Sequence, residues 1–112
     1  MIAKTASVEV LLGYDEATLR SKLIEFGVPR HLDDGIVLYL LQGIPMGGGL
    51  TAVFSNDLME AFGRADDETS YHMKHICEFI YSVAPNSSHG SPEKVQQYAQ
   101  EIRKRRLEEA SQ

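Results

Sequence analysis

GIPMGGGLTAVFSNDLMEAFGRADD, residues 43–67, is the stretch that decides the fold. A proline and three successive glycines, Gly47–Gly49, precede a pattern in which apolar residues recur every three or four positions. This unbroken stripe predicts one helix that packs against a core and begins after a loop with an accessible backbone. The alternative is two helices, because Ser55-Asn56-Asp57 followed by Glu60 resembles an internal helix cap. The stripe consists of Leu50, Val53, Phe54, Leu58, Ala61 and Phe62.

The composition is typical of one globular domain. The chain has 112 residues and a net charge of -5, which argues against nucleic-acid binding over the whole surface because such binding requires cations. Its single cysteine, Cys77, excludes an internal disulfide and is consistent with a reducing compartment. No apolar run approaches the roughly 20 residues that span a bilayer. We therefore expect a cytoplasmic protein with no membrane partner.

Helix signals recur along the whole chain. Asp15 and Gly27 bracket a predicted helix over residues 16–26, and Pro29 precedes a second over 31–42. The second is apolar nearly all round, so we expect it to be central. Another helix is predicted to end before Pro85, with Met73, Ile76, Cys77, Ile80 and Val83 on its inner face. Ser91-Pro92-Glu93 is the clearest helix start. The predicted fold is all-α, a single compact domain of four to six helices.

The two ends of the chain are predicted to pack least. Residues 1–13 are expected to form a short N-terminal arm, and the alternating segment 7–12 lacks a second strand with which to pair. The final helix packs through its first half. Residues 103–112 carry many charges and almost no apolar face, so this end is expected to project into solvent or onto a partner.

The glycine triplet is a candidate ligand site. Unhindered backbone N–H groups at a helix start can hold an anion such as a phosphate. The loop lacks the Gly-Lys-Ser/Thr ending of a nucleotide-hydrolysing loop, and its glycines alternatively serve only tight packing. The hypothesis places a small anionic, nucleotide-like ligand against Gly47, Gly48, Gly49, Leu50 and Thr51, with Arg64 supplying charge.

Two charged segments are candidate partner-binding surfaces. The acidic one comprises Asp57, Glu60, Asp66, Asp67 and Glu68, whose ordinary role is helix capping and solubility and whose alternative role is docking a basic partner. The basic one comprises Arg103, Lys104, Arg105 and Arg106, followed at once by two glutamates, which is more typical of a solvated helix end than of nucleic-acid binding.

Several groups of reactive side chains are too weakly patterned to assign chemistry. His72 and His75 lie three apart and could share a metal, but Cys77 is expected on the buried side of the same helix, so no metal ligand is assigned. His31 beside Asp33 and Asp34, and His89 among serines, are typical of polar loops and helix starts. We assign no catalytic residue and no cofactor.

The letters GIPxGxxLxAVxxNDL over residues 43–58, then Ala65-Asp66-Asp67 and GSPEKV over residues 90–95, resemble a family of small uncharacterised proteins from bacteriophages and prophages. The resemblance covers roughly residues 31–98. It implies a phage or mobile-element context, in which small compact proteins commonly bind host factors or small signalling molecules.

Together these patterns favour a non-enzymatic accessory protein that acts by binding. The first hypothesis is an interaction module for a host protein, with counter-defence as one role. The alternative is a binder or sponge for a small anionic ligand. A homodimer is a further expectation, because a helix that is apolar nearly all round can bury surface against a second copy.

Overall fold

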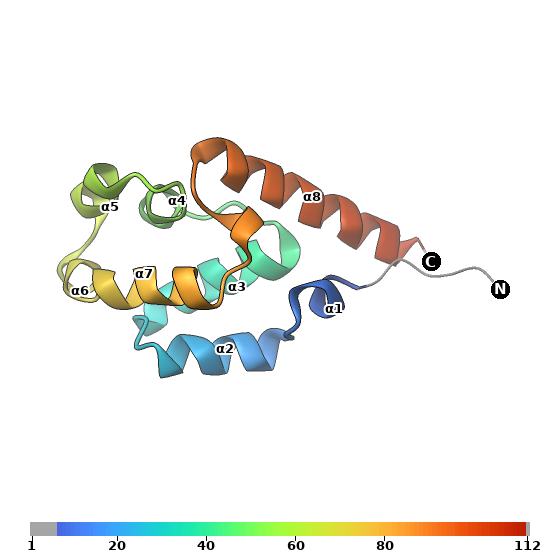
Figure 1. Cartoon of the computed structure of the whole chain (residues 1–112), viewed down its shortest axis with the longest axis horizontal. Coiled ribbons are helices and arrows are strands. Elements are labelled where there is room, and N and C mark those ends of the chain that lie inside the picture. The colour runs from blue at the N-terminus through green and yellow to red at the C-terminus, as the bar shows by residue number, and fades with distance from the viewer. Residues whose placement is uncertain (1–6, 112) are drawn as a thin grey trace.

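The computed structural model describes residues 7–111, and all regular structure in this part of the chain is helical, which confirms the predicted all-α class (Figure 1). None of the described helices is long and apolar enough to cross a membrane. The elements are α1 Val8–Leu12, α2 Glu16–Glu25, the 3₁₀ turn η1 Arg30–Leu32, α3 Asp33–Gln42, α4 Gly48–Phe54, α5 Leu58–Arg64, α6 Asp67–Tyr71, α7 Met73–Ser82, the 3₁₀ turn η2 Asn86–Ser88, and α8 Pro92–Ala110.

Helix α3 is the centre of the core, as its apolar sequence predicts. It contacts both α2 and α8, and only Leu38 among its large apolar residues is substantially exposed. Burying so many apolar side chains on one helix is the main favourable term for this fold. The buried residues of α3 are Asp33, Ile36, Val37, Tyr39, Leu40 and Leu41.

Tyr39 joins three elements to this core. Its ring lies 5.3 Å from that of Phe54 and 5.1 Å from that of Tyr98, measured between centroids. Its hydroxyl donates a hydrogen bond of 2.8 Å to the backbone oxygen of Ser88, which satisfies a polar group that is otherwise shut away from water. Burial raises the pKa of the Tyr39 hydroxyl, so it remains a neutral donor.

The predicted continuous helix over residues 50–62 is broken into α4 and α5, and the internal cap signal is the correct one. Asn56 has a φ of 65°, in the left-handed region, which ends α4. Asp57 then caps α5 by accepting a hydrogen bond from the backbone N–H of Glu60 at 3.3 Å. The break changes the rotation of the residues that follow it, so Leu58 and Phe62 do not continue the buried face to which Phe54 belongs.

A second break divides the predicted helix before Pro85 into α6 and α7. His72 lies between them with φ of -100° and ψ of 15°, outside the helical region. The inner face of α7 differs from the prediction, because Cys77 is exposed and Phe79 is buried against Phe26. These two breaks, with the helical N-terminal segment, give more helices than the four to six predicted.

The N-terminal segment is helical where the sequence indicated an arm or lone strand. Ser7 caps α1 by accepting from the backbone N–H of Val10, and Gly13 ends it with a left-handed φ of 83°. Val8 is fully buried. The rest of the predicted arm, residues 1–6, lies outside the described residues.

The C-terminal half of α8 is held against the body of the protein and does not simply project. Arg103 donates from Nη1 to the backbone oxygen of Gly43 at 2.6 Å, and Arg106 donates from Nε to that of Leu41 at 2.6 Å. Both carbonyls belong to the C-terminal end of α3, where they have no helical partner and the helix dipole favours cations. Arg106 also pairs with Glu9 of α1 at 3.0 Å.

Candidate functional site

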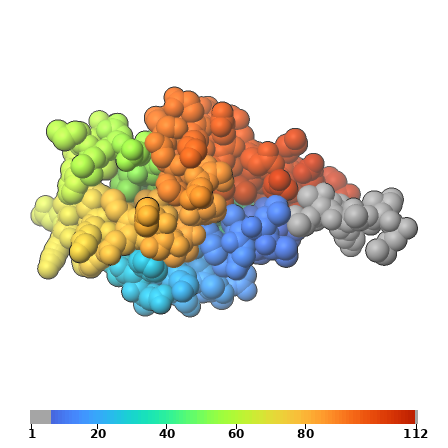
Figure 2. Space-filling model, in the orientation of Figure 1, coloured from blue at the N-terminus to red at the C-terminus, as the bar shows by residue number. Residues whose placement is uncertain are grey.

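Helix α5 places three large apolar side chains in solvent at the end of the molecule away from α1 (Figure 2). Leu58 is 60% exposed, Met59 85% and Phe62 45%. Positions 58, 59 and 62 lie on one face of a helix because residues three and four apart are neighbours. Only Ala61 of α5 is buried, so this helix turns its apolar face outwards. We call Leu58, Met59 and Phe62 the α5 face.

Carboxylates surround the α5 face in sequence and at both ends of the helix. Residues 57–68 contain five acidic residues and one cation, Arg64, and so hold most of the net negative charge of the chain. Asp57 caps α5, and Asp66 caps α6 by accepting from the backbone N–H of Thr69 at 2.7 Å. That hydrogen bond is the main cause that lowers the pKa of Asp66, with a smaller effect from His31. Of the acidic partner-binding residues predicted from sequence, Asp57 therefore precedes the α5 face and Asp66 and Asp67 follow it, whereas Glu60 pairs with Arg64.

The predicted ligand residues are divided between two cavities. The larger, about 370 Å³, is lined by Gly47, Gly49, Leu50 and Arg64, together with His31 and Asp66. Gly48 and Thr51 instead line a shallower cavity beside Asp57 and Glu60. Arg64 borders both, because its guanidinium lies across Gly48, where a Cβ atom would be 2.8 Å from Arg64 Nη1. Glycine at position 48 thus allows Arg64 to cross the loop.

The charges of the larger cavity are already paired. Arg64 binds Glu60 at 2.5 Å, and His31 contacts Asp66 at 3.3 Å and Glu68 at 3.1 Å. An anion entering here would compete with these carboxylates. Helix α4 adds little attraction because it has only seven residues. The hydroxyl of Thr51 donates to the backbone oxygen of Met46 at 3.1 Å and serves the loop itself.

The basic residues predicted to bind a partner have structural contacts. Arg103 and Arg106 hold the end of α3, as described above, and Arg105 pairs with Glu101 one turn earlier at 3.1 Å. The acidic and basic predicted surfaces are thus unequal. Asp57 and Asp66 cap the helices before and after the exposed apolar face, whereas Arg103 and Arg106 are used to hold α8 against α3.

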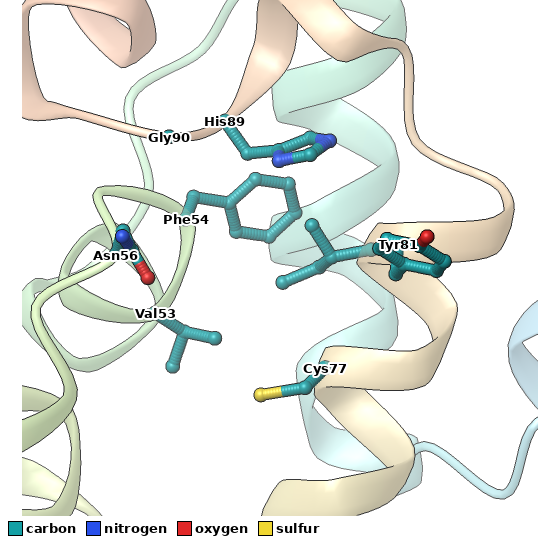
Figure 3. Close-up of a pocket in the computed structure, with 8 residues that line it drawn as sticks. Val53, Phe54, Asn56, Cys77, Tyr81, His89 and Gly90 are labelled. Carbon is teal, nitrogen blue, oxygen red and sulfur yellow. The ribbon is translucent and has the colours of Figure 1, made fainter.

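Cys77 and His89 line another cavity, with Val53, Phe54, Asn56 and Tyr81 (Figure 3). In this view the Cys77 sulfur is directed towards Val53 and not towards the imidazole of His89. Burial raises the pKa of the Cys77 thiol, and burial followed by the charge of Lys94 lowers the pKa of His89. Both shifts favour neutral side chains, the reverse of what an activated thiolate–imidazolium pair requires.

The other reactive groupings from the sequence are structural contacts. His31 contacts Asp66 and Glu68 instead of its sequence neighbours, because Asp33 pairs with Arg30 and Asp34 with Arg20. Ser88, beside His89, also has a structural partner: its buried hydroxyl donates a hydrogen bond of 2.6 Å to the backbone oxygen of Pro85.

Sequence reasoning missed the α5 face because it placed Leu58 and Phe62 in the inner stripe. The Ser55-Asn56-Asp57 cap is the sequence signal that could have revealed the α5 face, because a helix break there changes which side of the next helix faces the core. No family model, curated protein or solved structure significantly matches this chain.

Proposed function

We propose that the chain is a phage- or mobile-element-type accessory protein that binds a host protein through the α5 face, with antagonism of a host defence as one such role. The observation that carries this proposal is the exposure of Leu58, Met59 and Phe62 together on one helix. Adjacent apolar side chains bordered by polar residues are typical of protein-binding surfaces. The resemblance of residues 43–58 and 90–95 to phage-associated proteins supports the host context.

The chemistry of the face defines the partner. An apolar surface on α5, with Asp57 at its start and Asp66 and Asp67 after its end, favours a partner with an apolar centre and basic residues around it. The acidic border speeds encounter with such a surface, and it opposes a second copy of this chain, which would bring the same charges together. A homodimer across α5 is therefore disfavoured relative to a basic partner.

The three side chains of the α5 face can each contribute to the free energy of binding. Complete burial of a Leu, Met or Phe side chain contributes about 1.5–3 kcal/mol relative to full exposure. The 85% exposure of Met59 makes it the largest single contribution that a partner could gain from the three side chains. Met59 is accordingly the residue whose replacement should weaken binding most.

The alternative function, a binder of a small anionic ligand, is supported by the cavity that brings Gly47, Gly49 and Leu50 next to Arg64. The pairing of Arg64 with Glu60 and the acidic border weigh against it. A ligand in this cavity would need to displace Glu60 or carry groups that tolerate it.

Native mass spectrometry of the protein purified from a phage-infected host lysate tests the proposal. We expect a stoichiometric complex with a host protein that is lost in Met59→Glu, which puts a charge on the most exposed apolar residue of the α5 face. The matched control is Ile24→Glu on α2, which is also an exposed apolar residue, 64% exposed, but far along the chain from α5. It should retain the complex.

Two outcomes would contradict the proposal. One is a host protein bound equally by the wild type and Met59→Glu, which would place the contact elsewhere. The other is a co-purified small anion with no protein partner, lost in Arg64→Gln, which would establish the alternative. Circular dichroism of each variant checks that the helical fold is retained.

A further inference from the structure

Two histidines meet where α6 passes into α7. His72 lies at the junction, and its backbone N–H donates to the carbonyl oxygen of Glu68 at 3.1 Å, so its position is set by the end of α6. His75 lies in the first turn of α7. A spacing of three places both imidazoles on the same side of the chain. Neither residue borders the α5 face or contributes to the cavities described above.

The ring nitrogens face one another. The Nδ1 atoms of His72 and His75 are 3.1 Å apart, with ring centroids 5.2 Å apart and the planes inclined by 39°. With both imidazoles neutral, this contact needs a proton on one Nδ1 and a lone pair on the other. Two protonated rings would bring two donors together, and two Nε2–H tautomers would leave two lone pairs facing each other. A metal ion bound by both Nδ1 atoms requires the arrangement in which both rings carry their proton on Nε2.

The separation of the two nitrogens fits one bound ion. Nitrogens bound to the same ion at about 2.0–2.1 Å lie about 2.9 Å apart in a square plane and about 3.3 Å apart in a tetrahedron. The observed 3.1 Å lies between these two values. The distance between the nitrogens can therefore stay nearly unchanged, while each ring turns its Nδ1 lone pair away from the N–N line towards the ion.

Neighbouring residues hold the rings in place. The His75 ring packs on Gly27, where a Cβ atom would lie 3.1 Å from His75 Nδ1, so a larger residue there would push the ring by a few tenths of an ångström. Gly27 also has a φ of 77°, which favours glycine independently. The edge of Tyr71 meets the His72 ring, with centroids 4.9 Å apart and planes at 71°. Ligands that are fixed before binding lose less entropy when the ion arrives.

From this geometry we propose that His72 and His75 bind a divalent transition-metal ion, such as Zn²⁺ or Cu²⁺, through their Nδ1 atoms. Imidazole nitrogen is a preferred ligand of both ions. Within residues 7–111 no third His, Cys, Asp or Glu completes a cluster there. The remaining positions are therefore taken by water, and the site is open and exchangeable in contrast to a closed structural zinc site.

This assignment goes beyond the sequence analysis, which noted that His72 and His75 could share a metal but assigned no ligand because Cys77 was expected on the buried side of the same helix. Cys77 is exposed and borders the cavity with His89, so it has no part in the pair. The proposed ion site is independent of the proposed protein partner on α5.

Isothermal titration of metal-free protein with ZnCl₂ tests the site, and the four histidines of the chain provide matched controls. The wild type should bind one equivalent, and His72→Gln and His75→Gln should each weaken binding by about tenfold or more, because one nitrogen replaces a two-point attachment. His31→Gln and His89→Gln should leave the affinity unchanged. Met59→Glu should also retain zinc binding, which separates this result from a failure of the α5 proposal.

A second measurement keeps the test independent of how the variants fold. Electron paramagnetic resonance of the wild type with one equivalent of CuCl₂ should show coupling to two imidazole nitrogens, reduced to one in either variant. Absence of a one-equivalent zinc isotherm in the wild type, or equal affinities in the wild type and the His72→Gln/His75→Gln double variant, would overturn the proposal. The pair would then be a hydrogen-bonded contact only.

Discussion

The two ends of this molecule are packed very differently. Around α3 and α8, one large cluster of buried side chains continues from Val8 through Tyr39 and Phe54 to Ile102. At the other end, α5 contributes to a small separate cluster whose fully buried members are only Ala52, Ala61 and Met73. Small side chains such as alanine bury little area, so this second cluster stabilises little.

This difference in buried apolar area separates the half that stabilises the fold from the half that is available for binding. Segments with few buried apolar contacts open at low free-energy cost and are the usual location of binding surfaces. The α3–α8 half buries most of its large apolar residues, with Leu38 and Leu107 as exposed exceptions, whereas all three large apolar residues of α5 are exposed. Substitutions should therefore affect stability in one half and binding in the other.

The largest expected contrast is between two leucines. Leu40→Ala removes a fully buried side chain from α3 and should lower the free energy of unfolding by about 2–5 kcal/mol. Leu58→Ala removes an exposed side chain from the α5 face and should change it by less than about 0.5 kcal/mol. Urea denaturation followed by circular dichroism measures both. Equal losses would mean that α5 is as integral to the core as α3.

The next contrast compares two glycines. Gly43 has a φ of 71°, and a Cβ atom there would lie 2.4 Å from the backbone oxygen of Ala99 on α8. Gly43→Ala should therefore cost about 2–4 kcal/mol, from left-handed strain and overpacking together. At Gly48 the nearest atom belongs to the long side chain of Arg64, which can move. Gly48→Ala should cost much less in the same urea experiment, and a loss as large as that of Gly43→Ala would contradict this comparison.

The sequence predicted the packed half well because its signals are local and agree with one another. The apolar run of α3 indicated a central helix, and Ser91-Pro92 marked the start of α8, where Ser91 caps the helix and Pro92 is its first residue. When capping, periodicity and breakers coincide, the local pattern and the tertiary packing give the same answer.

The open half was harder to predict because two signals conflicted. Periodicity favoured one helix over residues 50–62, whereas the Ser55-Asn56-Asp57 cap favoured two. The structure has two helices, separated at Asn56, which adopts a left-handed conformation. In the packed half too, the contacts of Arg103 and Arg106 with the end of α3 were not predicted, because they depend on tertiary packing and leave no signal in the local sequence. The same holds for the His72–His75 distance, since a spacing of three brings two rings to one side without fixing their rotamers.

The smallest expected effect on stability concerns Arg106 of α8, which links α8 to Glu9 of α1, and this effect depends on pH. Arg106→Met should cost about 1–2 kcal/mol at pH 7, because it removes hydrogen bonds to the Leu41 carbonyl, to Glu9 and to Glu109. The control Arg105→Met breaks only an exposed pair with Glu101 and should cost less than about 0.5 kcal/mol.

The hydrogen bond from Arg106 is the main cause that lowers the pKa of Glu9 below its ordinary value of 4.5. A carboxyl whose pKa is lower in the folded state stabilises the fold above its unfolded pKa, and this contribution is lost as the pH falls through the folded value. The difference in stability between the wild type and Arg106→Met should therefore be largest near neutral pH. It should narrow as the pH falls below about 4.5 but not disappear, because the bond to the Leu41 carbonyl does not titrate. Urea denaturation of both proteins from pH 7 to pH 3 measures the difference. A difference that stays constant over this range would show that the pairing of Arg106 with Glu9 and Glu109 contributes nothing to stability, and that its contact with the Leu41 carbonyl accounts for the whole effect.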